Sequence, residues 1–395
     1  MRFIMVTHGS EGDYFPFTTL GRQFKQQGHE VILLGQEDAV RIAQKHGLDF
    51  HSICPVSHAL AVQRRLPEML AGTAANQLNI LWEIMVEDVT RRIQNKIEEL
   101  LVPGQTVVFA LSRLIGARIA RDRFHFPLIS VNLTPTCFDN FMDCQEQEAD
   151  RVIGHRLNQL RAEWNLAPLD QSIMRWCYSP DLTLALFPAW FAPGLAHWPK
   201  NTLHTTFPLP PLSDQPLDEE LTALVQAPAK PMVFIGGTFN MHPQAFLDTM
   251  YALCDRLHRP GILLGWRGPV PENPPANITI RPFVPLSALL PHVALYIHHA
   301  GVGSIAEGIR AGVPQIALPN ILQQKGLARR LEALGLGYNL EDQVPSVELV
   351  QPLAEQALKS QQLKSRCSEF STRFKGLNSG QAIADQALEA VKGLL

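Results

Sequence analysis

The feature that most constrains the fold is a glycine-rich segment from His298 to Gly308, which directly follows a strand-like apolar run over residues 293–297. Glycines at 301 and 303 let the backbone approach an anion, and the free N–H groups and dipole of a starting helix favour negative charge there. The segment therefore predicts a phosphate site at a strand-to-helix turn. The alternative is a tight turn whose glycines serve packing alone. The side chains that would add donors to a phosphate site are His298, His299 and Ser304.

The same glycines also fit the dinucleotide-binding pattern G-x-G-x-x-G/A over residues 301–306. A nicotinamide site of this kind needs a carboxylate about 20 residues further on to bind the ribose. The chain offers the amides of Gln323 and Gln324 in that region. The sequence therefore disfavours a nicotinamide-dependent enzyme.

The order of apolar runs predicts an α/β chain with two doubly wound domains. Strand-like and helix-like stretches alternate from the N-terminus, and the continuously apolar run 31–34 suits a parallel sheet covered on both faces. A proline-rich stretch over 207–216 cannot form a regular helix or central strand, and a second βα series restarts at 231. Because 395 residues exceed what one core usually supports, two domains are expected. The expected boundaries are 1–210 for the first domain, 217–380 for the second, and 381–395 for a last helix that packs back on the first.

The composition excludes several classes of function. The formal net charge is −3 and no long basic run exists, so nucleic-acid binding is not expected. The N-terminus lacks the length and cleavage site of a secretion signal, and no apolar stretch reaches the roughly 20 residues of a spanning helix. We expect a cytoplasmic protein whose membrane contact, if any, is peripheral at the inner face. The 6 cysteines form no C-x-x-C pair, so no zinc or other metal site is predicted.

Three parts of the chain carry a resemblance to a known family. The second half of the chain resembles, in the order and spacing of four segments, the donor-binding motif of family 1 glycosyltransferases. These segments are 298–304, Ala311-Gly-Val-Pro-Gln-Ile-Ala-Leu-Pro319, a paired-amide position and Ala328-Arg-Arg330. The loop Gly9–Pro16 resembles the bacterial and sterol branch, and Leu186–Pro193 resembles the rhamnosyltransferase of rhamnolipid synthesis. This resemblance implies a GT-B architecture, in which two Rossmann-like domains face each other across a cleft.

The resemblance also implies a set of donor-binding residues in the second domain. A nucleotide diphosphate sugar would be the co-substrate, with no resident cofactor and no metal. The diphosphate would bind a set of residues at the turn: His298, His299, Gly301, Gly303 and Ser304. Gly237 and Thr238 would contact the phosphates from the opposite side. The base would lie beside Trp266, Phe283 and Val284, the ribose would bind Glu307, and the sugar would meet Gln323 and Gln324. For Trp266 a core position is the alternative, because tryptophan is often buried for packing alone.

The sugar-reading position departs from the family pattern. The family often carries Asp-Gln after the Ala-Gly-Val-Pro block, whereas this chain has Gln323-Gln324. A carboxylate accepts hydrogen bonds from vicinal hydroxyls more strongly than an amide does. Glucose recognition is therefore disfavoured, and dTDP-rhamnose is the favoured donor. The alternative is a UDP-glucose-dependent glucosyltransferase of a sterol or natural product.

Asp13 is the candidate catalytic base for an inverting, metal-independent transfer, because it lies in the loop after the first strand, where open α/β sheets bind ligands. Ser10 would orient this loop, and His8 is a second candidate. The alternative for Asp13 is the N-cap of a helix that starts near Phe15. The departing diphosphate would be stabilised by the helix start after His299 and by hydroxyl donors.

The acceptor is expected to meet the first domain. Residues 71–101 read as a helical insertion with apolar positions at helical spacing, which suits a lipidic or aromatic small molecule with a hydroxyl group. A helix face that packs on the core is the favoured interpretation of these apolar positions, and contact with the acceptor is the alternative. Two other functions remain open: a nucleotide-sugar epimerase, and a non-catalytic binding subunit of a glycolipid-synthesis complex. The apolar residues in question are Leu78, Leu81, Trp82 and Met85.

Overall fold

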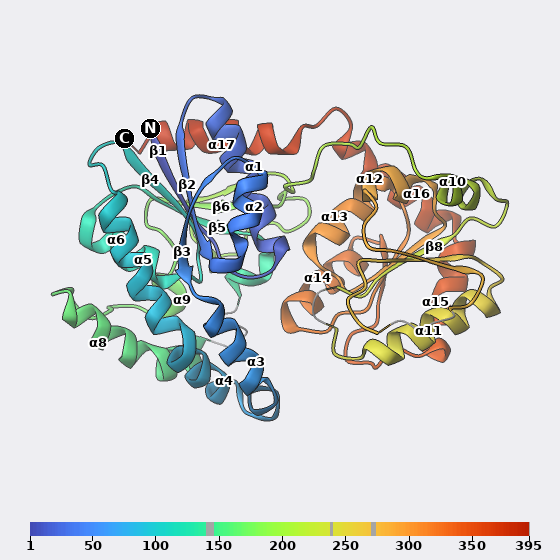
Figure 1. Cartoon of the computed structure of the whole chain (residues 1–395), viewed down its shortest axis with the longest axis horizontal. Helices are drawn as coiled ribbons and strands as arrows, with labels where there is room; N and C mark the ends of the chain where they lie inside the picture. The colour runs from blue at the N-terminus through green and yellow to red at the C-terminus, as the bar shows by residue number, and fades with distance from the viewer. Residues whose placement is uncertain (140–145, 238–239, 270–273, 395) are drawn as a thin grey trace. The chain divides into compact units, whose positions relative to one another are not determined.

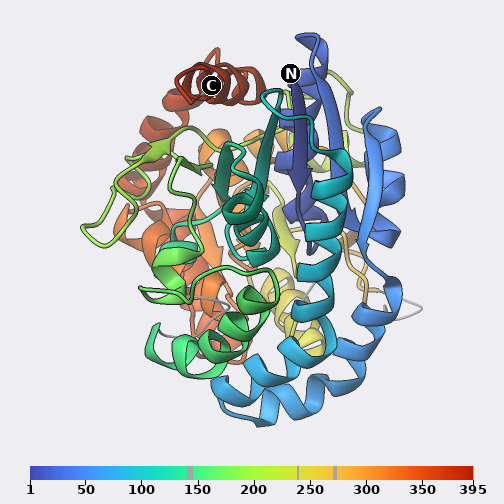
Figure 2. The same cartoon turned by 90° about the vertical axis from the view of Figure 1, so that its left-hand side faces the viewer.

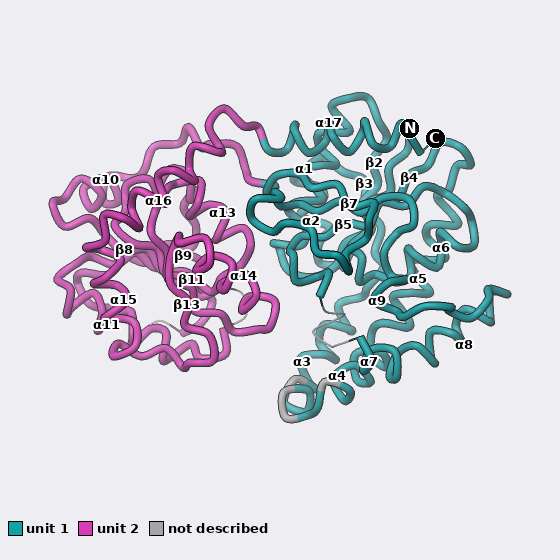
Figure 3. The backbone as a smooth tube through the Cα atoms, turned by 180° about the vertical axis from the view of Figure 1, so that it is seen from behind, with its two compact units in different colours: residues 1–208, 379–395 teal, residues 209–378 magenta. Residues whose placement is uncertain are grey.

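The computed structural model describes residues 1–139, 146–237, 240–269 and 274–394. The chain divides into two compact units, shown in separate colours in Figure 3. Unit 1 comprises Met1–Pro208 together with Ser379–Leu395, and unit 2 comprises Leu209–Asn378. The division after Pro208 falls within the proline-rich stretch.

Unit 1 is built on a parallel sheet that, within the described residues, has seven strands in the order β3-β2-β1-β4-β5-β6-β7. The central strands are buried along their length because helices cover both faces, which explains their continuous apolar runs. The strands are β1 (Arg2–Val6), β2 (Glu30–Gln36), β3 (Asp49–Cys54), β4 (Thr106–Leu111), β5 (Leu128–Asn132), β6 (Leu182–Ala185) and β7 (Thr202–His204).

The helices of unit 1 fall into two groups, which Figures 1 and 2 show from two sides. Some pack on the sheet, and others form a helical insertion beyond it. Those on the sheet are α1 (Glu11–Gln26), α2 (Val40–Lys45), α5 (Glu87–Leu100), α6 (Ile115–Phe124) and α17 (Ser379–Lys392). The insertion contains α3 (Val56–Ala71), α4 (Ala74–Leu81), a π-helical turn at Trp82–Val86, α7 (Glu146–Ala149), a second π-helical turn at Asp150–Gly154, α8 (His155–Glu163) and α9 (Ile173–Trp176).

Alternate residues of β1 point to two separate cores. Phe3 and Met5 pack with apolar residues of α1 and α17, whereas Ile4 and Val6 pack with those of α5 and α6. The last helix therefore completes one face of the sheet in which the chain begins. Figure 1 shows α17 beside α1, and residues of the two helices are in contact.

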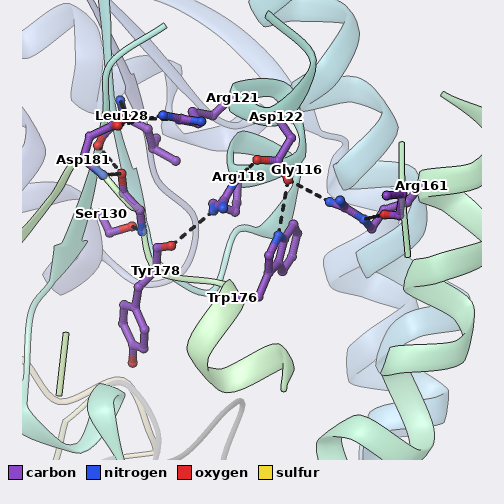
Figure 4. A network of polar contacts seen from close by, with 12 residues as sticks. Gly116, Arg118, Arg121, Asp122, Leu128, Ser130, Arg161, Trp176, Tyr178 and Asp181 are labelled. Carbon is purple, nitrogen blue, oxygen red and sulfur yellow. Dashed lines mark hydrogen bonds and ion pairs between the residues drawn. The ribbon is translucent and has the colours of Figure 1, made fainter. Parts of the chain in front are cut away.

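A buried polar cluster ties α6 to the insertion (Figure 4). Asp122 on α6 accepts hydrogen bonds from Arg161 Nη1 at 2.8 Å and Trp176 Nε1 at 3.3 Å, and it also pairs with Arg118. Arg118 in turn donates to the carbonyl oxygen of Tyr178 at 3.2 Å. Because buried charges are costly unless paired, these contacts fix α8 and α9 against the sheet domain.

Unit 2 repeats the plan with a parallel sheet of six strands among the described residues, in the order β10-β9-β8-β11-β12-β13. The strands are β8 (Met232–Ile235), β9 (Gly261–Leu264), β10 (Ile278–Arg281), β11 (Leu295–His298), β12 (Gln315–Ala317) and β13 (Gly337–Asn339). The helices are α10 (Glu219–Gln226), α11 (Pro243–Arg256), α12 (Leu286–Leu289), α13 (Val302–Ala311), α14 (Leu322–Ala333), α15 (Val347–Lys359) and α16 (Gln361–Ser371). The predicted α/β class with two doubly wound domains is confirmed.

Membrane-spanning helices were not expected from the sequence. Over the described ranges, no helix combines the length and the apolar character that a bilayer crossing requires.

Candidate active site

The glycine-rich turn lies between β11 and α13, at the carboxyl end of a central strand of unit 2. Gly301 is the N-cap of α13, and Ala300 before it has the left-handed φ of 62°. The N–H groups of Val302, Gly303 and Ser304, in the first turn, have no partner within the helix. Free N–H groups and the positive end of the helix dipole at a strand's carboxyl end make a site for an anionic group.

His298 has a structural role in this turn, which corrects the prediction that its side chain contacts the donor. The residue is fully buried, with Nε2 2.8 Å from Gln315 Oε1 and Nδ1 accepting from the Ala300 N–H at 3.0 Å. Burial, with a smaller effect of His299, lowers the pKa of His298 to about 3, so the ring is neutral. Both ring nitrogens are used, and they hold Ala300 in its left-handed conformation.

His299 is the histidine of the pair that a ligand could contact. Its backbone N–H donates to the carbonyl oxygen of Ile235 at 3.2 Å, and burial lowers the pKa of its ring. Within the described part of the chain, Nδ1 has no hydrogen-bond partner. Two glycines make room for this ring, since a Cβ would lie 2.5 Å from His299 Cγ at Gly237 and 2.6 Å from Nε2 at Gly301.

Gly303 differs from the other glycines of the turn. It is exposed, and a Cβ at this position would meet no atom within 4 Å. Packing therefore does not require a glycine at 303, whereas it does at 301. Ser304 is half-buried in the same first turn. Thr238, predicted to close over the phosphates, lies outside the described residues.

The residues predicted to border the base are divided between surface and core. Phe283 is 78% exposed, whereas Val284 is buried in the apolar core of unit 2 and its side chain is not available to a ligand. For Val284 only a contact between its backbone and the base stays a prediction. Trp266 is half-buried and stacks on Phe246 with ring centroids 5.7 Å apart, and its Nε1 donates to the Pro269 carbonyl at 3.1 Å.

Glu307, predicted to bind the ribose, already has a charged partner. Its carboxylate lies 2.5 Å from Arg310 Nη2 and is buried, and burial raises its pKa. Arg310 also donates from Nη1 to the carbonyl oxygen of Pro210 at 2.6 Å. A ribose hydroxyl at Glu307 would share this carboxylate with Arg310.

The paired amides Gln323 and Gln324 lie in the first turn of α14, and the side chain of Gln324 hydrogen-bonds to the loop before this helix. Its Oε1 accepts from the Asn320 N–H at 2.7 Å, while Gln323 is half-buried in the same turn. A cavity of about 230 Å³ opens between the loops that follow β8, β12 and β13, and His299 and Asn320 line it. Gln323 and Gln324 are not among its lining residues.

In unit 1, Asp13 is the third residue of α1, and Ser10 is its N-cap. The helix begins at Glu11, four positions before the start near Phe15 that was expected, so the predicted N-cap role for Asp13 is wrong. Asp13 Oδ2 accepts from the backbone N–H of Ser10 at 2.8 Å and from its hydroxyl at 3.0 Å. Oδ1 lies 2.8 Å from Arg113 Nη2. Both carboxylate oxygens therefore have partners in the folded chain.

His8 lies in the loop between β1 and α1, close enough to Asp13, Arg113 and His58 for their charges to affect its pKa. Burial is the largest influence and Arg113 adds to it, and together they lower the pKa of His8 to about 4. Asp13 acts in the opposite direction. At neutral pH the imidazole is unprotonated, which is the form that can accept a proton.

No metal site was predicted, and the described residues contain no group of three or more His, Cys, Asp or Glu side chains placed to hold an ion. The donors that the turn offers to an anion are N–H groups and a histidine. Negative charge can therefore be stabilised there by the protein itself.

Comparison with known proteins relates both units to sugar transfer. Residues 3–90 match the glycosyltransferase family 28 N-terminal domain, and residues 267–374 match the C-terminal domain of erythromycin biosynthesis protein CIII-like proteins. The chain is a GT-B-type glycosyltransferase. Two relatives span most of this enzyme. The O-mycaminosyltylonolide 6-deoxyallosyltransferase of Streptomyces fradiae is 26% identical over 85% of this chain and 84% of its own length. The dTDP-epi-vancosaminyltransferase of Amycolatopsis orientalis is 26% identical over 91% and 90%.

A solved structure shows the same fold as this glycosyltransferase. The glycosyltransferase VinC in complex with dTDP is 19% identical, with a TM-score of 0.73 over 100% of both chains. The match covers both parallel-sheet units and so agrees with the GT-B architecture implied by the sequence motifs.

Three residues that position the site in this glycosyltransferase were not singled out from the sequence. Arg113 follows β4 and binds Asp13, and Gln315 begins β12 and binds His298. A Cβ at Gly308 would collide with the Gln315 amide, so Gly308 allows α13 to pack against this side chain. The signal for Gln315 was present, since a polar residue in a buried parallel strand requires a partner.

The apolar residues of the insertion have mostly core positions. Leu78 is 1% exposed and Trp82 is 2% exposed, while Leu81 and Met85 are partly buried. Trp82 Nε1 also lies 3.2 Å from Glu87 Oε2. Leu78 and Trp82 therefore stabilise the insertion of this glycosyltransferase, which agrees with the interpretation of these residues as a core-facing stripe and not with the alternative of an acceptor contact.

Proposed function

We propose that this enzyme transfers a 6-deoxyhexose, with dTDP-rhamnose as the favoured donor, to a hydroxyl group of a hydrophobic natural product, with inversion at the anomeric carbon. The observation that carries the proposal is the α13 turn, where free N–H groups and His299 meet at the carboxyl end of β11. The names of two relatives, a 6-deoxyallosyltransferase and a dTDP-epi-vancosaminyltransferase, support a deoxysugar on a thymidine nucleotide.

In this proposal the diphosphate binds the first turn of α13 beside His299, and Gly303 leaves its approach open. The exposed ring of Phe283 and the half-buried ring of Trp266 offer flat apolar surfaces to the thymine base. Glu307 accepts a hydrogen bond from the ribose while it remains paired with Arg310. As the anomeric bond breaks, negative charge grows on the diphosphate, and these donors bind it more strongly than they bind the intact donor.

The proton of the acceptor hydroxyl passes to His8 in this proposal. The acceptor oxygen then bonds to the anomeric carbon on the face opposite the diphosphate, and dTDP leaves with the electron pair of the broken bond. The neutral ring of His8 can accept the proton, whereas both oxygens of Asp13 are held by Ser10 and Arg113. The negative charge of Asp13 stabilises the imidazolium that forms, as an orienting carboxylate does in other His-based sites.

The test is a transfer assay with dTDP-rhamnose or UDP-glucose and a panel of acceptors that begins with hydroxylated lipids and macrolides. Mass spectrometry should find a product heavier by one deoxyhexose, formed at the same rate in EDTA, and NMR should find the inverted anomer. Loss of donor without an acceptor would instead indicate an epimerase. A glucoside formed only from UDP-glucose would contradict the proposed donor and leave the reaction class intact.

A further inference from the structure

The cavity of unit 2 lies on one side of the α13 turn. It is bounded by the loops that follow β8, β12 and β13, and His299 lines it together with Asn320, Lys325 and Asp342. Because His299 belongs to the turn proposed for the diphosphate, the cavity adjoins that site. None of the residues that the family resemblance assigns to the sugar, Gln323 and Gln324, lines it.

The sheet order indicates which part of a donor would reach this cavity. Going across the sheet, β10 and β9 lie on one side of β8 and β11, whereas β12 and β13 lie on the other. Phe283 and Trp266 follow β10 and β9, and the cavity residues Lys325 and Asp342 follow β12 and β13. In a nucleotide sugar the diphosphate separates the nucleoside from the sugar. With the diphosphate at β11 and the base at β9 and β10, the sugar therefore falls at β12 and β13.

The charged part of the cavity lining is an ion pair between α14 and the loop that follows β13. Lys325 Nζ contacts Asp342 Oδ1, and the side chains are 25% and 63% exposed. Asp342 has the left-handed φ of 60°, a conformation that aspartate and asparagine adopt more readily than most residues. Asn320 is fixed beside them, because its Oδ1 accepts from the Met241 N–H at 3.1 Å and its N–H donates to Gln324 at 2.7 Å.

We propose that Asp342 and Lys325 bind the ring hydroxyls of the donor sugar, and that Asp342 supplies from the β13 loop the carboxylate that position 323 lacks. This rests on the proposed function. A sugar hydroxyl both donates and accepts, so a carboxylate and an ammonium group side by side fit two neighbouring ring hydroxyls. Phe246, Leu318 and Val344 give the cavity an apolar patch beside polar residues such as Asn240 and His242. An apolar patch suits the methyl group of a 6-deoxyhexose better than a hydroxymethyl group.

The test separates binding of the sugar from binding of the nucleotide. Calorimetry measures Kd for dTDP and for dTDP-rhamnose with the full chain, as wild type and as Asp342→Asn and Lys325→Met. Asparagine keeps the left-handed turn and the shape of the side chain, and it replaces the charged carboxylate by a neutral amide with one accepting oxygen. The expected result is an unchanged Kd for dTDP, and a Kd for dTDP-rhamnose raised about tenfold or more, as for the loss of a hydrogen bond to a charged group.

Glu341→Gln is the matched control. It removes the neighbouring carboxylate, which binds Arg329 at 3.0 and 2.8 Å and does not line the cavity. Both Kd values should match the wild type. If Asp342→Asn and Lys325→Met bind dTDP-rhamnose as the wild type does, the sugar site is elsewhere and the inference is overturned. If wild-type protein binds neither dTDP nor dTDP-rhamnose, the proposed function itself fails, and the two failures are thereby distinguished.

Discussion

Four residues separate His8, in the loop after β1, from Asp13, in the first turn of α1, and their surroundings give them different chemistry. The Asp13 carboxylate accepts two hydrogen bonds from Ser10 and pairs with Arg113, so its oxygens are occupied before any substrate arrives. His8 is kept neutral, mainly by burial. The sequence placed both residues at the right edge of the sheet, but only the tertiary contact with Arg113 reveals that the carboxylate is held.

Replacing each residue in turn tests this division of roles. We expect His8→Ala to lower kcat by about 10²- to 10⁴-fold, the usual contribution of a general base, with little change in KM for the donor. Asp13→Asn should lower kcat less, because the ring of His8 remains. Steady-state kinetics on both variants, with circular dichroism to verify folding, gives the comparison. A larger loss in Asp13→Asn than in His8→Ala would return the base to Asp13.

The lowered pKa values of the buried His298 and the half-buried His8 also predict how stability depends on pH. The pKa is lowered to about 3 for His298 and about 4 for His8, whereas an unfolded histidine titrates near 6.5. Between those values the unfolded chain binds protons that the folded chain does not, so acid favours unfolding. The free energy of unfolding should fall as pH drops from about 6.5 to about 4, by at most about 1.4 kcal/mol per pH unit for each histidine.

Urea unfolding at intervals over this range measures the slope. The slope should be shallower in His298→Gln than in wild type, because one of the two groups that take up protons on unfolding is gone. An equal slope in both proteins would mean that His298 is not held neutral in the folded state.

At the scale of elements, α13 and its turn contain glycines with two different purposes. A Cβ at Gly301 would press on His299, and one at Gly308 would collide with Gln315, so both are needed for packing. Gly303 faces open space. The sequence could not distinguish them, because each fits the same glycine-rich pattern. Only the position of the His299 and Gln315 side chains separates packing from ligand access.

Gly303→Ala and Gly301→Ala form a matched pair that tests this difference. Gly303→Ala should leave the free energy of unfolding unchanged or raise it by up to about 1 kcal/mol, since alanine favours helix over glycine. It should weaken dTDP binding, because its methyl group lies where the diphosphate approaches. Gly301→Ala should weaken dTDP binding and should also lower the free energy of unfolding. Thermal melting and dTDP calorimetry give both quantities, and normal dTDP binding by Gly303→Ala would place the phosphate elsewhere.

The start of α1 shows how an element boundary was misjudged. The proline at position 16 suggested a helix that begins near Phe15, since proline is favoured in a first turn. The helix begins at Glu11 because Ser10 and Asp13 satisfy each other's backbone N–H groups in a capping box. The strands were easier to predict, because a parallel sheet covered on both faces requires continuous apolar runs.

In the whole molecule, the last helix, α17, belongs to unit 1 although it follows unit 2 in the sequence. Ile383, Ala387 and Val391 of α17 are fully buried against Phe17 and Phe24 of α1. The core on this face of the β1 sheet is therefore complete only when the last residues are in place. The folding of unit 1 thus depends on residues that follow unit 2 in the sequence.

Ile383→Ala should therefore destabilise unit 1 by about 2 to 5 kcal/mol, the usual cost of truncating a buried isoleucine. Hydrogen exchange followed by mass spectrometry should find faster exchange in β1 and β4 and unchanged exchange in β8 and β11. Lys392→Ala, at the exposed end of the same helix, is the control and should change neither. Faster exchange confined to unit 2 would contradict the assignment of α17 to unit 1.

Calorimetric titration of the full chain shows whether unit 2 binds a thymidine-diphosphate sugar at the α13 turn. The ligands are dTDP-rhamnose, dTDP, UDP-glucose, UDP and NADH, without added metal. We expect dTDP and dTDP-rhamnose to bind, dTDP-rhamnose to bind more tightly than UDP-glucose, and Gly303→Ala to weaken the binding of both thymidine ligands. Binding of NADH alone would show instead that the same glycines bind a dinucleotide, and would rule out a sugar-nucleotide site at this turn.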